Sequence, residues 1–426
     1  MAWFRKKAKV FVLGLDGVPY SFLKKETDHG NLPHLAEMFQ QGTLRRMHSV
    51  YPTVSSVAWT TYATGENPAG HNIFGFVDRI PDPFTIRIPT ARDRKAQTLW
   101  QNLSQAGRRV IVINVPLTYP PEPVNGILVS GFLCTDINKS SYPPDFSNHL
   151  KSKAYVIDVD AWLARKSKGE FMDKLHQAME KRFEIAFALM EEEKWDFFQL
   201  HIMETDRLFH FFWEDLETRG EYDPQIESFF DKLDGFIGQV EQRLSGKDGF
   251  LILSDHGFCG IKAEVQLNVW LEKEGLLRFE EGADKKLEHY HRDSMCYSLI
   301  PGRIFINLEG REEKGTVKPG DYEKVREEIK GRLLGFRDPG NHGKIIDRIF
   351  FREEIYQGPY MENAPDMVAH PVRGYDLKAR VGGHDIFERS ALKGMHTYDD
   401  AFICGVNLDA SSVTSIQDVR GSGLRL

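Results

Sequence analysis

The sequence has few cysteines and no long apolar run. Its four cysteines, Cys134, Cys259, Cys296 and Cys404, are far apart and form no CxxC pair, so we expect reduced, mostly buried thiols. No stretch approaches the roughly 20 apolar residues that a membrane span needs. The apolar run that follows the basic N-terminus is too short for a signal peptide and ends on Asp16. We therefore expect a cytoplasmic protein without a membrane span.

Basic residues are not in excess either. Lys and Arg number 55 against 62 Asp and Glu, which gives a formal net charge of −7. Because nucleic acids are bound through clustered Lys and Arg, a nucleic acid polymer is not an expected partner. A small anionic substrate remains compatible with this charge if metal ions supply positive charge locally. The sequence does not define the oligomeric state.

The composition is otherwise that of a globular protein. Apolar residues make up 41% and charged residues 27% of the 426 positions. This length suffices for two domains, or for one large domain that carries an insertion.

Short apolar segments alternate with longer helical patterns along most of the chain. The segments KVFVLGL, RRVIVINV, WDFFQLHIM and GFLILS have the composition of buried strands, and helical patterns cover 31–42, 96–106, 169–193 and 224–245. Such alternation is typical of an α/β fold with a mostly parallel central sheet and helices on both faces. Nearly continuous apolar strands support this fold, because both faces of such a sheet are buried.

The pattern changes between about residues 260 and 380, where the chain becomes charged and irregular. We interpret 263–380 as an inserted cap, and 1–262 with 381–426 as the core. The segment AFICGVNL at 401–408 is expected to return to the sheet. The last residues, SIQDVRGSGLRL, show little pattern and are expected to fray.

Aspartates stand at or near the ends of three of the apolar segments. Asp16 ends VFVLGLD, Asp255 ends FLILSD, and Asp206 follows FFQLHIMET. The carboxyl ends of strands in an open α/β sheet face one crevice, so these side chains could converge there. A single aspartate at a strand end is more often a turn residue or a helix cap.

Histidines accompany these aspartates. Asp206 and His210 are four residues apart, so on a helix they share one face and can reach the same metal ion. Asp255 is followed directly by His256, and His396 precedes the late apolar strand. Mixed carboxylate and imidazole ligands suit zinc and also accept manganese or iron. The alternative for His210 is a core histidine within an aromatic helix.

The hydroxyl-rich segment SSVAWTTYATG, residues 55–65, has the features of a helix start and ends at Gly65. A hydroxyl at a helix N-terminus lies beside unpaired backbone N–H groups that bind phosphate oxygens. A metal ion on that hydroxyl would lower its pKa and make it a nucleophile. The alternative is that these hydroxyls only cap the helix and solvate the loop.

Together these segments resemble the alkaline phosphatase superfamily, and most closely its type I phosphodiesterase/nucleotide pyrophosphatase branch. The resemblance rests on five ordered segments: GLDG at 14–17, PTVSSVAWTTYATGENPAGH at 52–71, METDRLFHFFW at 203–213, SDHGF at 254–258 and GMHTYDDAFICG at 394–405. Each segment alone is a loose motif, but their order and residue types are specific.

The resemblance implies two divalent metal ions, most commonly zinc with manganese as the alternative, about 4 Å apart at a phosphoryl-transfer site. Asp206, His210 and His396 would hold one ion, and Asp16, Asp255 and His256 would hold the other together with the nucleophile oxygen. The implied reaction has two displacements. A hydroxyl attacks the small phosphate-ester substrate to give a phospho-enzyme, and metal-activated water then hydrolyses it.

The family spacing, ten residues before Gly65, assigns the nucleophile to Ser55, with Thr53 and Ser56 as competitors. Ala58 stands where many nucleotide pyrophosphatases have an Asn that binds a phosphate oxygen, which puts a nucleotide preference in doubt. His71 resembles a structural turn histidine, with Asn72 in a position that accepts the left-handed conformation.

Two late residues also fall in family-like contexts. His384 is a second candidate for the late ligand, although the sequence around His396 fits better. Asp366 resembles a feature of the cap rather than a ligand.

Other functions remain open from sequence. A phosphomonoesterase or a phosphosugar mutase would share the metal ligands, whereas the CxPSR-like context of a sulfatase is absent. An inactive metal-binding scaffold is the alternative from another class. We predict a diester preference, because no Arg stands beside the nucleophile to hold a second phosphate charge.

Overall fold

The computed structural model describes residues 8–282 and 284–422, which form two compact units. The first unit contains the described parts of 1–66, 90–258 and 396–426, and the second contains those of 67–89 and 259–395. The predicted cap at 263–380 therefore falls wholly within the second unit. The second unit also takes in 67–89, 259–262 and 381–395, which the prediction had placed in the core.

The first unit is built on a sheet that has eight strands within the described residues, in the order β2-β19-β9-β1-β8-β5-β6-β7. Its strands are β1 Val10–Leu15, β2 Thr43–Met47, β5 Val110–Ile113, β6 Gly126–Val129, β7 Ser141–Tyr142, β8 Phe197–Ile202, β9 Gly249–Leu253 and β19 Ala401–Val406. The central strands from β9 to β6 are parallel, and the pairs at both edges are antiparallel. The predicted mostly parallel α/β sheet is confirmed, and AFICGVNL does return to it, antiparallel to β9.

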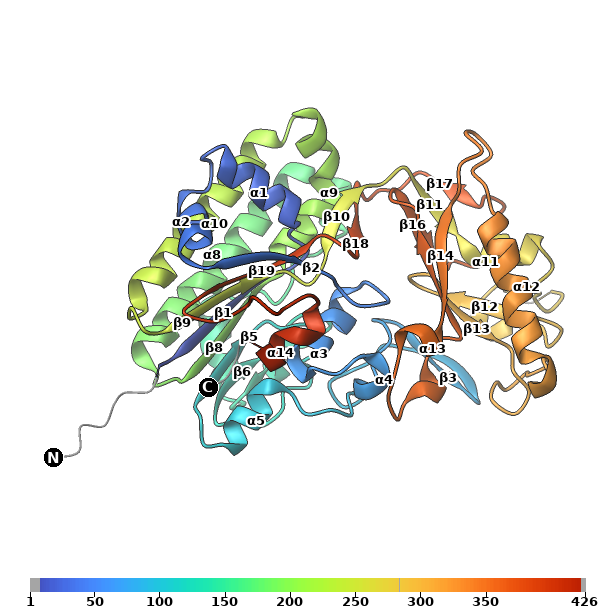
Figure 1. Cartoon of the computed structure of the whole chain (residues 1–426), viewed down its shortest axis with the longest axis horizontal. Coiled ribbons are helices and arrows are strands. Elements are labelled where there is room, and N and C mark those ends of the chain that lie inside the picture. The colour runs from blue at the N-terminus through green and yellow to red at the C-terminus, as the bar shows by residue number, and fades with distance from the viewer. Residues whose placement is uncertain (1–7, 283, 423–426) are drawn as a thin grey trace. The chain divides into compact units, whose positions relative to one another are not determined.

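Helices cover both faces of this sheet (Figure 1). One face carries α2, α8 and α10, and the other carries α3, α5 and α14. The helices of this unit are α1 Tyr20–Asp28, α2 Pro33–Gln41, α3 Ser55–Thr64, α5 Leu99–Gln105, α6 Phe146–Ser152, α7 Leu163–Lys166, α8 Lys168–Glu192, α9 Glu204–Thr218, α10 Asp223–Arg243 and α14 Val419–Ser422.

Both faces of β1 are buried, which explains its uninterrupted apolar sequence. Val10 and Val12 pack in a cluster with Trp59 of α3. Phe11 points to the opposite face, where its ring stacks on Phe198 with 4.9 Å between centroids. Each fully buried side chain of this size contributes about 1.5–3 kcal/mol. Strand β1 is thereby anchored from both sides, and its carboxyl end is held in place.

The second unit contains one antiparallel sheet and one smaller sheet that mixes a parallel and an antiparallel pair. A four-stranded sheet has the order β12-β13-β15-β14, and β16-β11-β17 form another sheet. Their bounds are β11 Ala263–Gln266, β12 Cys296–Leu299, β13 Arg303–Ile306, β14 Ile346–Phe351, β15 Met367–Pro371, β16 Tyr375–Lys378 and β17 Phe387–Glu388. The unit also contains the hairpin β3 Asp78–Pro81 and β4 Phe84–Arg87, with helices α4 Pro68–His71, α11 Leu267–Lys273, α12 Tyr322–Gly335 and α13 Arg352–Ile355. Strands β10 Gly257–Gly260 and β18 Gly394–Thr397 run across the boundaries between units.

Asp366 is held by hydrogen bonds within the second unit. It is buried and accepts hydrogen bonds from both terminal nitrogens of Arg311, at 2.8 and 2.6 Å, and from the backbone N–H of Ile306 at 2.6 Å. These contacts tie the strand of Ile306 to the segment before β15.

The expectation that the chain frays after residue 415 is wrong for 416–422. Ile416 and Val419 are fully buried in the core cluster that contains Trp59. Arg420 at the start of α14 donates to the backbone oxygens of Thr64 and Gln97. A short apolar pair is enough to dock the segment on α3, although the pair shows no periodicity; residues 423–426 lie outside the described part.

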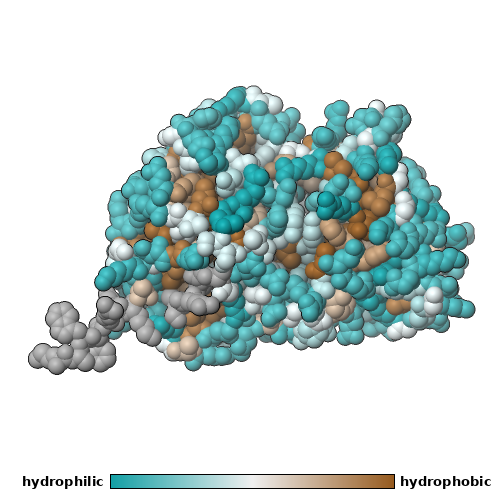
Figure 2. Space-filling model, in the orientation of Figure 1, coloured by the Kyte–Doolittle hydropathy of each residue, from teal (hydrophilic) through white to brown (hydrophobic). Residues whose placement is uncertain are grey.

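Figure 2 shows that hydrophilic residues cover most of the face in view, and that hydrophobic residues appear on it in separate smaller areas. Within the described residues, no helix combines the length and the apolar character that crossing a bilayer requires.

Candidate active site

The sheet topology brings the predicted aspartates to one rim. Asp16 follows β1 and Asp255 follows β9, while Asp206 lies in the first turn of α9 directly after β8. Strands β9, β1 and β8 are neighbours and run parallel, so their carboxyl ends meet at the same edge. The convergence predicted from the strand ends is therefore present in the first unit.

Ser55, Asp16, Asp255 and His256 form one cluster, with all four side chains buried. The hydroxyl of Ser55 donates to Oδ1 of Asp16 at 3.0 Å and lies 3.3 Å from Nε2 of His256. Nε2 of His256 is also 3.5 Å from Oδ1 of Asp16 and 3.4 Å from Oδ2 of Asp255. The backbone N–H of Gly17 donates to Oδ1 of Asp255 at 3.1 Å, so the other oxygen of Asp255 faces the cluster.

Asp206, His210 and His396 form a second cluster. Nε2 of His396 lies 3.1 Å from Oδ1 of Asp206 and 3.0 Å from Nε2 of His210. The Asp206 oxygen is 3.4 Å from the same nitrogen of His210, as the spacing of four residues on α9 predicts. The other ring nitrogen of His396, Nδ1, lies 3.1 Å from the backbone oxygen of Thr53, which orients the ring.

The two clusters are in contact. The rings of His256 and His396 are stacked with 3.7 Å between centroids. Ligand atoms of Asp206, His256 and His396 lie within 4.8 Å of one another, and the same is true of Asp16, Asp255 and His256. The arrangement is one polar centre with two groups of donor atoms.

Ser55 occupies the first position of α3, and Val54 is the N-cap residue. The hydroxyl is therefore not used as a cap and is turned toward Asp16. Thr53 donates its hydroxyl to the backbone oxygen of Val50 at 3.0 Å, whereas the hydroxyl of Ser56 has no hydrogen-bond partner among the described residues. At the other end, Gly65 ends α3 with φ of 70°, as predicted.

Burial and neighbouring charges shift the pKa values of the carboxylates and imidazoles in the two clusters. Burial raises the pKa of Asp255 well above its usual value, and the negative charge of Asp16 raises it further. Burial and the neighbouring His396 hold the pKa of His256 well below its usual value, so its imidazole is neutral. Burial would raise the pKa of Asp206, but His210, His396 and Arg207 outweigh it and lower that pKa.

These donor atoms fit divalent cations. An oxygen of Asp206 and the Nε2 atoms of His210 and His396 lie 3.0 to 3.4 Å apart in the second cluster. Two imidazole nitrogens this close need either a proton between them or a cation that both can bind. Oδ2 of Asp255 is buried without a hydrogen-bond donor among the described residues. Carboxylate and neutral imidazole ligands are the set that zinc and manganese bind. A cation in each group would satisfy these atoms and offset the charge of Asp16 and Asp255.

The sequence model of the type I phosphodiesterase / nucleotide pyrophosphatase family matches residues 10–399. The chain belongs to this family. It is therefore a phosphoryl hydrolase, and both clusters lie within the matched range. No curated protein sequence matches the chain significantly.

Solved structures of low sequence identity share the fold. Phosphonoacetate hydrolase from Sinorhizobium meliloti 1021, in complex with phosphonoformate, is 18% identical with a TM-score of 0.66, and the match covers 97% of this chain and 94% of that chain. Murine ectonucleotide pyrophosphatase/phosphodiesterase 5 is 14% identical with a TM-score of 0.56 and coverages of 97% and 93%. The human form is 15% identical with a TM-score of 0.58 and the same coverages.

Three side chains that contact the two clusters were not predicted from sequence. Trp59 and His201 each contact Oδ2 of Asp16, at 2.9 and 3.0 Å. Arg207 donates to Oδ2 of Asp206 at 3.1 Å and forms two hydrogen bonds with Asp158. Arg207 directly follows Asp206 in the sequence. A positively charged residue next to an expected metal ligand could have indicated this contact. His201 had no signal, because a histidine inside an apolar strand is ordinarily a core residue.

The other histidines that the family resemblance raised have different environments. Nδ1 of His71 accepts the backbone N–H of Ile73 at 3.1 Å, and Asn72 has φ of 67°. The turn predicted there is present. His384 is exposed and lies in a loop of the second unit.

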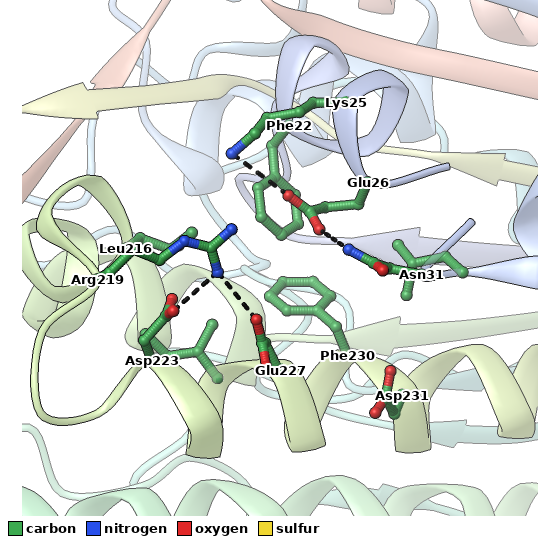
Figure 3. Close-up of a pocket in the computed structure, with 12 residues that line it drawn as sticks. Phe22, Lys25, Glu26, Asn31, Leu216, Arg219, Asp223, Glu227, Phe230 and Asp231 are labelled. Carbon is green, nitrogen blue, oxygen red and sulfur yellow. Dashed lines mark hydrogen bonds and ion pairs between the residues drawn. The ribbon is translucent and has the colours of Figure 1, made fainter. Parts of the chain in front are cut away.

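A separate pocket of about 220 Å³ lies between α1, α9 and α10 and contains none of the predicted site residues (Figure 3). Arg219 bridges Asp223 and Glu227 in this pocket. The rings of Phe22 and Phe230 line it and pack against Phe209, which precedes His210 on α9. The pocket thus adjoins α9, the helix that carries Asp206 and His210 of the second cluster.

Proposed function

We propose that the chain is a metal-dependent phosphodiesterase that acts through a phosphoserine at Ser55. The observation that carries this proposal is the position of the Ser55 hydroxyl, 3.0 Å from Oδ1 of Asp16 and 3.3 Å from Nε2 of His256. A structural serine at the first position of a helix would face solvent or cap the backbone. This one is buried among groups that favour loss of its proton.

In the first displacement the Ser55 oxygen attacks the phosphorus atom and the alcohol group of the ester leaves. The hydroxyl proton points at Oδ1 of Asp16, which is the nearest acceptor. Nε2 of His256, whose imidazole is kept neutral by burial, lies 3.3 Å from the same Ser55 oxygen and can also accept a proton. The bond that forms joins the Ser55 oxygen to phosphorus, and the bond that breaks joins phosphorus to the leaving oxygen.

The N-terminus of α3 can offset the negative charge on the phosphoryl oxygens. The first turn of a helix has backbone N–H groups without intrahelical partners, and its dipole is positive at that end. Ser55 and Ser56 lie in this turn. Ala58 offers no side-chain donor. The backbone N–H groups and the cations must therefore offset more of the negative charge of the phosphoryl group.

Asp16, Asp255 and His256 would hold one divalent cation, and Asp206, His210 and His396 a second, with zinc proposed first and manganese as the alternative. Bound there, two such ions supply positive charge that acidifies the nucleophile and neutralises the phosphoryl group. The chain contributes the ligand orientation, through the contacts of Thr53, Trp59, His201 and Arg207.

In the second displacement water hydrolyses the phosphoserine and restores Ser55. Asp206, His210 and His396 are the chain's own groups that can orient this water. Stacking of His396 on His256 places the second cluster immediately beside the first. All seven proposed site residues belong to the first unit, which we assign as the catalytic core, with the second unit as the cap.

A small phosphodiester is the proposed substrate class. The neighbours of Ser55 in sequence are Val54 and Ser56, so no Arg stands there to hold the second charge of a monoester. A monoester carries that extra charge and a diester does not. This difference supports a diesterase over the phosphomonoesterase alternative.

The test is hydrolysis of bis-(p-nitrophenyl) phosphate by the full chain with zinc or manganese added, and by Ser55→Ala under the same conditions. We expect turnover by the wild-type chain and a loss of at least about a thousandfold in Ser55→Ala. Parallel assays with p-nitrophenyl phosphate and a phosphonate ester compare the substrate classes. Absence of turnover with any divalent metal would instead favour an inactive metal-binding scaffold.

A further inference from the structure

The two carboxylate oxygens of Asp16 have different partners. Oδ1 faces Ser55 and His256 at the centre. Oδ2 accepts the indole N–H of Trp59 at 2.9 Å and lies 3.0 Å from Nε2 of His201. Trp59 comes from α3 and His201 from β8, so two separate elements meet on this one oxygen.

The rings of Trp59 and His201 support each other. They pack edge to face with 4.7 Å between centroids and an interplanar angle of 87°, and both side chains are fully buried. This geometry is a favourable arrangement for two aromatic rings. Neither ring can turn away from Asp16 without displacing the other.

Gly14 on β1 makes room for this pair. A Cβ at Gly14 would lie 2.5 Å from Cη2 of Trp59 and 3.2 Å from Cδ2 of His201. Those distances are shorter than van der Waals contact, and a buried indole ring has little freedom to move. The absence of a side chain at Gly14 is therefore required for Trp59 to lie where it reaches Asp16.

A carboxylate oxygen accepts about two hydrogen bonds, so Oδ2 is fully used by Trp59 and His201. Only Oδ1 remains for Ser55 and for a cation. Trp59 donates without adding charge, because its N–H is neutral. At Asp206, by contrast, the outer oxygen is held by the positively charged Arg207.

We propose that Trp59 and His201 are positioning residues that present Asp16 to the divalent cation and to Ser55 through Oδ1 alone. The inference rests on the proposed function, because it assigns a purpose to the orientation of one proposed ligand. Partners that orient a ligand in this way commonly account for 10- to 100-fold in metal affinity. Neither residue touches the substrate, so the effect passes through Asp16.

The test is titration of the metal-free full chain with Co²⁺, followed by visible absorption of the bound ion. We expect Trp59→Phe and His201→Leu to weaken Co²⁺ binding by about 10- to 100-fold and to change the absorption spectrum. His201→Gln keeps an N–H donor at the end of its side chain, and binding should recover most of the way. Gly14→Ala, which leaves all polar groups in place, should reproduce the Trp59→Phe result by displacing the ring.

Trp100→Phe is the matched control. Trp100 is equally buried in the same core cluster, and its indole N–H has no hydrogen-bond partner among the described residues. Its replacement removes the same atoms and should leave Co²⁺ binding unchanged. Circular dichroism and thermal unfolding of each variant separate loss of folding from loss of the ligand orientation.

The outcomes are distinct. Unchanged Co²⁺ binding by Trp59→Phe and His201→Leu, with normal binding by the wild-type chain, would overturn the inference and leave the proposed function standing. Equal weakening by Trp100→Phe would also overturn it, because the effect would then come from core packing. A wild-type chain that binds no divalent cation would overturn the metal-dependent function and the inference together.

Discussion

The hydroxyl of Ser55 donates a hydrogen bond of 3.0 Å to Oδ1 of Asp16, a residue 39 positions earlier in the chain. Asp16 directly follows the central strand β1, and Ser55 begins the helix that packs on the same sheet. The buried strand end and the helix N-terminus thus meet at a single polar contact. That contact distinguishes Ser55 from the other hydroxyls of its segment.

The first prediction concerns the identity of the nucleophile. Thr53→Val and Ser56→Ala should each keep at least about a tenth of the wild-type rate, because neither hydroxyl contacts the proposed ligands, whereas Ser55→Ala should be inactive. Acid quenching during turnover of the diester, followed by peptide mass spectrometry, should find the phosphoryl group on Ser55. Label on Thr53 or Ser56 would reassign the nucleophile.

A second prediction concerns the late histidine ligand. His396→Ala should lower the bound metal and the hydrolysis rate, because Nε2 of His396 lies 3.1 Å from Asp206 and 3.0 Å from His210. His384→Ala should change neither, since His384 is exposed in a loop. Elemental analysis of both purified variants makes the comparison, and the reverse ranking would exchange the two assignments.

Removal of metal should destabilise the first unit. Without cations, burial and then the negative charge of Asp16 disfavour the ionised form of Asp255 and raise its pKa. A cation at about a thousand times its dissociation constant stabilises the folded chain by about 4 kcal/mol. Calorimetry with and without a chelator should therefore show a lower unfolding temperature for the chelated protein, restored when zinc or manganese is added. Identical unfolding curves would argue against bound cations.

The ion pair between Arg182 and Glu204 should matter more for stability than any surface pair. Both side chains are buried, and Nε of Arg182 lies 2.8 and 2.9 Å from the two oxygens of Glu204, in the first turn of α9. Arg182→Met leaves a buried carboxylate unpaired, which should cost about 3–5 kcal/mol in urea unfolding.

The exposed pair of Arg243 and Glu191 gives the control, and Arg243→Met should cost less than about 1 kcal/mol. The double variant Arg182→Met with Glu204→Met should recover part of the loss, because no buried charge is left alone. Equal destabilisation by the buried and exposed substitutions would contradict the assignment.

Asp366 should make the stability of the second unit depend on pH. Burial would raise its pKa, but the hydrogen bonds and charge of Arg311 outweigh burial and lower it. A lowered pKa stabilises the folded state above the ordinary pKa of about 3.9, and this stabilisation is lost as the pH falls through the lower folded value. Asp366→Asn should therefore unfold at a lower temperature than the wild type near pH 7.

The difference between Asp366→Asn and the wild type should shrink below about pH 4, as the wild-type carboxylate takes up a proton. Thermal unfolding of both proteins at several pH values between about 3 and 7 measures this convergence. A difference that stays constant across that range would show that packing, and not charge, accounts for the effect.

Local sequence determined the framework of the first unit. Continuous apolar strands separated by amphipathic segments are compatible with a parallel sheet buried on both faces, and that sheet is present. The same pattern located Asp16 and Asp255 at strand ends, and the spacing of four residues paired Asp206 with His210. These features depend on residues that are close together in the chain, so they can be predicted from the sequence.

Tertiary structure alone decided which side chains meet. His396 joins Asp206 from 190 residues away, and the hydroxyl that faces Asp16 is Ser55 because α3 packs at one particular rotation on the sheet. His201 looked like any histidine in a buried strand until Trp59 and Gly14 placed its ring on Asp16. The direction of a side chain beyond a strand end is set by packing between distant elements, and no local pattern records that packing.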